Sequence, residues 1–76
     1  MNANRRKALQ AIIDTITEAN EKLTDLMNEE QEYFDNMPEG LQAGERGERA
    51  EEAISNLEDA IGELESAVEN IETSIE

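Results

Sequence analysis

Apolar side chains recur at helical spacing in two long stretches of this 76-residue chain. In the first stretch, from about residue 3 to residue 36, Leu9, Ile16 and Leu23 lie seven residues apart. Two further rows run beside them, one of Ile12, Ala19, Leu26 and Tyr33 and one of Ile13, Met27 and Phe34. This spacing predicts an amphipathic helix with an apolar stripe wider than a coiled-coil seam.

The second stretch, from about residue 45 to residue 76, keeps the same period over four heptads. One row contains Ala50, Leu57, Leu64 and Ile71, another contains Ile54, Ile61, Val68 and Ile75, and a row of Ala53, Ala60 and Ala67 lies beside them. Such a sustained heptad pattern predicts a second long helix that packs in a coiled-coil-like manner. Gly47 is expected to weaken its first turn.

A turn is predicted between the helices, over residues 37–44. Pro38 disfavours the helical conformation for Met37, and Gly40 and Gly44 favour turn geometry. When the chain is folded back about Gly40, Leu9 meets Ile71, and the numbers of facing residues add to 80. The sequence therefore predicts an all-α fold, a single antiparallel two-helix hairpin spanning residues 1–76.

Two helices cannot enclose an apolar stripe of this width. Pairing two hairpins into a four-helix bundle would cover the remaining apolar surface, so we expect a homodimer. Alternatively, a foreign partner docks on that surface. Two polar residues, Asn20 and Glu30, stand at inward positions of the first helix, where we expect Glu30 to pair with Arg46 or Arg49 at the open end. We also expect Arg5, Arg6 and Lys7 to lie beside Glu69, Glu72 and Glu76.

Charge narrows the classes of partner. Twenty acidic residues against six basic ones leave a formal net charge of −14, which disfavours direct contact with nucleic acid or an anionic membrane. A charged partner would therefore be a basic protein. The chain has no apolar run long enough to span a membrane and no apolar segment after its basic N-terminal residues, so a cytoplasmic location is expected.

Catalysis has little support in the composition. Histidine and cysteine are absent, which excludes disulfides and the common zinc, iron and copper sites. No glycine-rich phosphate loop is present. The sequence therefore predicts a binding protein with no enzymatic activity, no cofactor and no metal.

Two groups of residues are candidates for partner binding. The first is an acidic face on the second helix, made of Glu51, Glu58, Asp59, Glu65 and Glu69. It is either a solubilising surface or a mimic of the DNA phosphate backbone that occupies a basic groove. The second is the turn tip, where Tyr33, Phe34, Met37 and Leu41 form either a small core or an interface anchor.

The turn and the start of the second helix resemble a known group of proteins. The segment DNMPE-x-LQ at residues 35–42 and the segment AEEAI-x-x-LE-x-AI at residues 50–61 are similar to small acidic proteins encoded in phage and prophage genomes. The resemblance implies an accessory protein in the host cytoplasm that binds and inhibits a host machine, such as a DNA-binding or defence protein. No activity is established for that group.

Two other functions stay open at this point. The chain could be a structural helical bundle that associates only with itself. It could also be an oligomer that sequesters a nucleotide signal between protomers through Arg5, Arg6, Lys7, Arg46, Arg49 and Tyr33.

Overall fold

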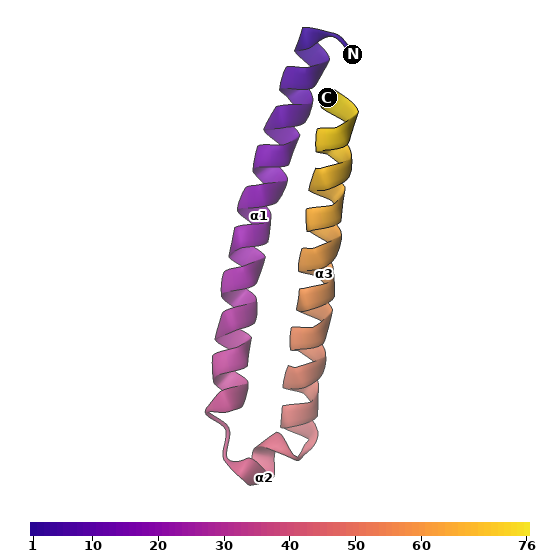
Figure 1. Ribbon diagram of the computed structural model, residues 1–76. Coiled ribbons are helices and arrows are strands. Elements are labelled where there is room, and N and C mark those ends of the chain that lie inside the picture. Colours follow the sequence, from indigo (N-terminus) through magenta and orange to yellow (C-terminus); the bar gives the residue numbers. More distant parts are fainter.

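The protein folds as an antiparallel helical hairpin in a computed structural model that describes residues 1–76 (Figure 1). Helix α1 spans Ala3–Asp35, the single-turn helix α2 spans Glu39–Gln42, and helix α3 spans Glu45–Ile75. The two long helices lie side by side, with both termini at one end and α2 at the other. The molecule measures 58 × 15 × 12 Å. The predicted all-α hairpin is confirmed.

Local signals in the sequence set both ends of α1. The side-chain oxygen of Asn2 accepts a hydrogen bond from the backbone N–H of Arg5 at 2.7 Å, which satisfies one of the free donors in the first turn. At the other end, the N–H of Asn36 still bonds the carbonyl oxygen of Glu32. Pro38, two residues further on, has no N–H with which to continue the ladder.

The predicted turn over residues 37–44 contains a short helix, which was not predicted. The N–H groups of Leu41 and Gln42 both donate to the carbonyl oxygen of Pro38, and these bonds form the short helix α2. Gly44 is the N-cap residue of α3, and its carbonyl oxygen accepts from the N–H of Glu48 at 3.0 Å. The chain thus reverses direction through a hydrogen-bonded turn rather than a loose loop.

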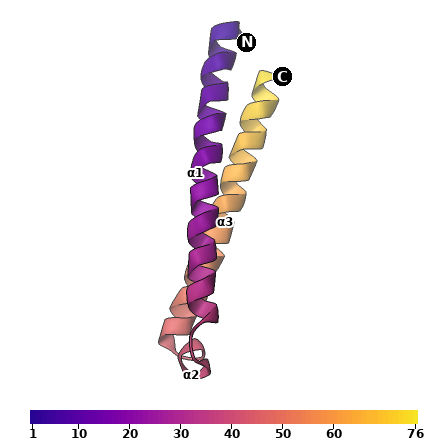
Figure 2. The same cartoon turned by 90° about the vertical axis from the view of Figure 1, so that its left-hand side faces the viewer.

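The hairpin has almost no interior of its own. Only Ile13, Gly47, Ala50 and Ile54 are buried among the 76 residues. Three of these four residues lie in the first third of α3, close to the turn. In the view of Figure 2, α3 is tilted relative to α1, so the two helices overlap near the turn. Apolar burial within one chain is therefore small, as is usual for so short a chain.

One row of the predicted apolar stripe stays outside the contact between α1 and α3. The rows that contain Ile13 and Leu23 are buried or half-buried against α3. In the third row, the exposed fractions are 48% for Ile12, 56% for Leu26 and 51% for Tyr33. We call Ile12, Ala19, Leu26 and Tyr33 the outer row. It is large, apolar and without a partner in the single chain.

Candidate functional site

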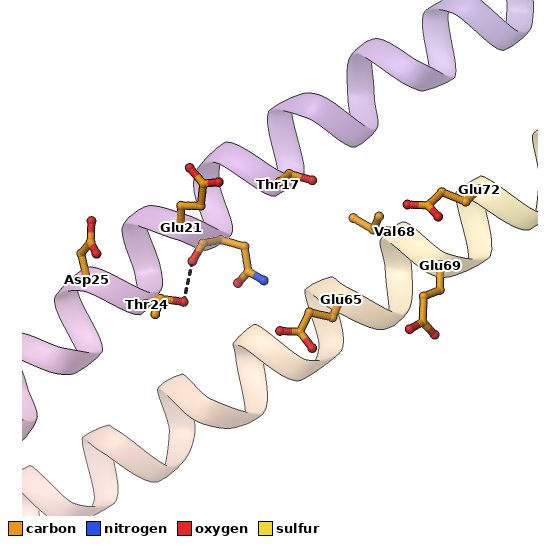
Figure 3. A pocket seen from close by; sticks show the side chains of 9 residues that line it. Thr17, Glu21, Thr24, Asp25, Glu65, Val68, Glu69 and Glu72 are labelled. Atoms are coloured by element: carbon orange, nitrogen blue, oxygen red, sulfur yellow. Dashed lines mark hydrogen bonds between the residues drawn. The ribbon is translucent and has the colours of Figure 1, made fainter.

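A polar groove runs between α1 and α3 on one side of the hairpin (Figure 3). Five carboxylates line it, and we call them the acidic groove: Glu21, Asp25, Glu65, Glu69 and Glu72. Thr17, Asn20, Thr24 and Val68 complete the lining, and no basic residue is present. Because the carboxylates come from both helices, the groove concentrates negative charge along the axis of the hairpin.

The structure divides the predicted acidic face. Glu65 and Glu69 line the groove, and Glu51 and Glu58 precede Glu65 by two heptads and one heptad, so they continue the same side of α3. Asp59 is exposed but does not line the groove. All five residues of the predicted face are accessible to a partner.

The α1 contribution to the groove was not predicted from the sequence. Glu21 and Asp25 line the groove from α1, and in Figure 3 their carboxylates point away from α3. Their four-residue spacing, which places two side chains on one helix face, was the available signal. Without the helix pairing, however, that signal does not say which neighbour the face meets.

Asn20 sits at the floor of the groove. Its side-chain Nδ2 donates to the carbonyl oxygen of Ile61 at 3.4 Å, while its Oδ1 is buried without a hydrogen-bond partner. The hydroxyl of Thr24 donates to the backbone oxygen of Asn20 at 2.9 Å. Asn20 and Ile61 have numbers that add to 81, one more than the sum of 80 predicted for facing residues.

The opposite side of the hairpin is apolar over most of its length. Residues of the outer row and the alanine row, Ala53, Ala60 and Ala67, recur every seven residues and so keep to one side of each helix. Near the turn, Tyr33 lines a hollow together with Glu30, Ala50 and two arginines, Arg46 and Arg49. Arg46 precedes Ala53 by one heptad, which places the alanine row on the same side of the molecule as the outer row.

The turn tip combines two roles. Phe34 and Met37 are half-buried, and the side-chain amide of Gln42 donates to the backbone oxygen of Phe34 at 2.9 Å. Tyr33 and Leu41 are 51% and 44% exposed and border a shallow hollow at the end of the molecule. Two residues of the predicted tip therefore pack inside, and two remain available for contact.

The predicted ion pairs between the helices do not form. The two ion pairs present join Lys22 to Glu18 and Arg49 to Glu45, each within one helix. Arg49 bonds Glu45 at 2.6 Å because the two residues are one turn apart on α3. Glu30 shares a hollow with the two arginines without pairing to either. Since both ion pairs are highly exposed, they contribute little to stability.

The two basic clusters lie far apart in one hairpin. Arg5, Arg6 and Lys7 belong to the end that carries the termini, whereas Arg46 and Arg49 lie beside the turn (Figure 1). A single chain therefore does not gather them around one ligand. No group of three or more carboxylates has an arrangement that could hold a metal ion. None of the helices combines the length and apolar character needed to cross a membrane.

Three comparisons with known proteins found no match for this chain. No protein-family model, no curated protein and no solved structure matches it.

Proposed function

We propose that this chain is a non-catalytic binding protein that pairs with a second copy and presents its acidic groove to a basic surface of another protein. In its most specific form, it is an inhibitor that occupies the nucleic-acid-binding surface of a host protein. The resemblance of the turn and of α3 to small acidic phage proteins supports this form, which would act in the host cytoplasm.

The observation that carries the proposal is the separation of the two sides of the hairpin. Five carboxylates and no basic residue line one side, whereas the outer row and the alanine row occupy the other. Five of the twenty acidic residues of the chain line this groove, and no basic side chain offsets them there. Carboxylates held along a rigid helix offer a regular line of negative charge, which a basic groove also meets in a nucleic-acid backbone.

Capture of a partner from a host lysate tests this function directly. The tagged protein is expected to retain a basic, nucleic-acid-binding protein at low salt and to lose it at high salt, because exposed charges are screened. Excess duplex DNA is expected to compete for the same protein. Retention that DNA does not affect would contradict the inhibitor form, since the two ligands would then bind different surfaces.

A matched pair of variants locates the binding surface. Glu65→Lys with Glu69→Lys reverses two carboxylates of the groove, whereas Asp59→Lys with Glu63→Lys makes the same charge change at exposed positions outside it. The groove variant is expected to lose the partner and the control to keep most of it. Equal retention by both variants would show that the groove is not the binding surface.

Self-association without any other partner is the alternative outcome. If the tagged protein retains only its own untagged copies at every salt concentration, the acidic groove has no protein ligand under those conditions. The structural-bundle function would then replace the binding function.

A further inference from the structure

We propose that the outer row of α1 docks on the alanine row of a second copy of this chain, with the turns of both chains at the same end of the bundle. The proposal rests on the self-association proposed above and specifies its surface and its orientation. No part of the same chain covers the large side chains of the outer row, which are about half exposed.

The size of this side suits a stable dimer. A face with the length and width of the hairpin, 58 by 15 Å, has an area of roughly 900 Å², comparable to the ~800 Å² that each partner buries in a standard interface. Ile12, Leu26 and Tyr33 are each about half exposed on it. Covering them would supply the apolar burial that the single chain lacks.

On this side, two of the three pairs of residues at equal height combine a large side chain with an alanine. In the hairpin, residues at equal height have numbers that add to about 80, as the contact of Asn20 with Ile61 shows. The outer row and the alanine row follow this rule with a constant sum of 79. Ile12 lies level with Ala67, Ala19 with Ala60, and Leu26 with Ala53.

A two-fold axis parallel to the helices would bring these residues of equal height into contact between the two chains. It would keep every residue at its own height and place α1 of one chain over α3 of the other. Leu26 would then meet the partner's Ala53, and Ile12 would meet the partner's Ala67. At these two heights a large side chain would face an alanine, and at the centre Ala19 would face the partner's Ala60, so the backbones could approach closely.

The other two-fold arrangement, with turns at opposite ends, is less favourable. It would place α1 on α1 and α3 on α3, so that large residues such as Leu26 face large ones while alanines face alanines. Charge also disfavours it. From Ala3 to Asp35 the chain has eight acidic and four basic residues, and from Glu45 to Glu76 it has eleven acidic and two basic. The opposite-end dimer would bring the two more acidic helices together.

A single spin label at the turn distinguishes these arrangements. The chain has no cysteine, and a Cβ at Gly40 would meet nothing within 4 Å, so Gly40→Cys accepts a nitroxide without disturbing the fold. Since packed helices lie 8–10 Å apart, the same-end dimer gives a label-to-label distance of roughly 30 Å or less. A distance near the 58 Å length of the hairpin, or no dipolar signal at all, would overturn the proposal.

Disulfide trapping provides an independent measurement. Ala19 and Ala60 are the central residues of α1 and α3. A mixture of the Ala19→Cys and Ala60→Cys proteins is expected to form the mixed disulfide, because the same-end dimer places these positions opposite each other. Efficient linkage of Ala19→Cys to itself, with little mixed product, would instead show the opposite-end dimer.

The outcomes for the dimer and for the acidic groove are separable. A long label distance with salt-sensitive capture of a basic protein would overturn the orientation and leave the proposed binding function intact. A short label distance without any captured protein would support the dimer and contradict the binding function.

Discussion

Gly47 lies so close to the backbone of Gln42 that no side chain fits between them. A Cβ at Gly47 would lie 2.6 Å from the Cα of Gln42 and closer still to its carbonyl group. Backbone atoms cannot rotate away as the end of a flexible side chain can, so the turn would have to move. Gly47 is thus the point at which the start of α3 passes against the end of α2, and it is buried.

Substitution of Gly47 should destabilise the hairpin. Gly47→Ala forces the turn away from α3 and is expected to lower the free energy of unfolding by about 1–3 kcal/mol, as for other overpacked sites. The control is Gly62→Ala, since a Cβ at this position meets nothing and alanine favours a helix by about 1 kcal/mol over glycine. Urea denaturation should shift the two midpoints in opposite directions. If both substitutions raised the urea midpoint by the same amount, only helix propensity would matter at Gly47.

The side chain of Gln42 should fasten the turn to α1. Gln42→Ala removes its hydrogen bond to the backbone oxygen of Phe34 and is expected to reduce stability by about 1 kcal/mol. Gln31→Ala is the matched control, because Gln31 bonds an exposed neighbour, Asp35, one turn along the same helix. The urea midpoint of the control should change by less than half as much. A larger loss of stability in the control would show that the hydrogen bond from Gln42 to Phe34 does not hold the turn against α1.

Asn20 should lower the free energy of unfolding relative to an apolar residue at the same position. Asn20→Leu removes a buried side-chain oxygen that has no partner and adds apolar contact with α3, so the free energy of unfolding is expected to rise by about 1 kcal/mol or more. Asn28→Leu, at an exposed position, should change it by under about 0.5 kcal/mol. A polar residue at a seam position commonly fixes register. Destabilisation by Asn20→Leu would show that its bond to Ile61 outweighs the unpartnered oxygen.

Salt should stabilise the protein. The chain has a net charge of −14, and its two ion pairs are exposed, so repulsion between carboxylates dominates the charge interactions. The melting temperature is expected to rise as sodium chloride shortens the screening length from about 30 Å at 0.01 M to about 10 Å at 0.1 M. The rise should be smaller in a variant with Glu58→Gln and Asp59→Asn. A fall in melting temperature with salt would mean that attractive pairs dominate.

The heptad rows were sufficient to predict the fold because they specify both helices and their direction. Leu23 and Ile54 each belong to a row that the structure places in the contact between α1 and α3. The helix α2 was not predicted, since four residues are too few for a periodic signal. The close approach of Gly47 to Gln42 was also missed, because it joins residues from two elements whose relative position depends on the turn.

The surfaces were less predictable than the fold. Glu65 could be assigned to an acidic face from α3 alone, but the contribution of Glu21 required the pairing of the two helices. The expected pairing of Glu30 with an arginine was wrong, because Arg49 has a carboxylate closer by on its own helix. The exposure of Leu26 could not be inferred either, since a wide apolar stripe does not show which of its rows faces the neighbouring helix.

Sedimentation equilibrium tests whether the outer row is an interface between two copies of this chain. The wild-type protein is expected to have twice the 8.5 kDa mass of the chain. Leu26→Glu should yield the monomer mass, because a charge would be buried in the interface. Asn28→Glu adds the same charge at an exposed position and should remain dimeric. A wild-type protein that sediments as a folded monomer, or a Leu26→Glu protein that stays dimeric, would contradict the claim.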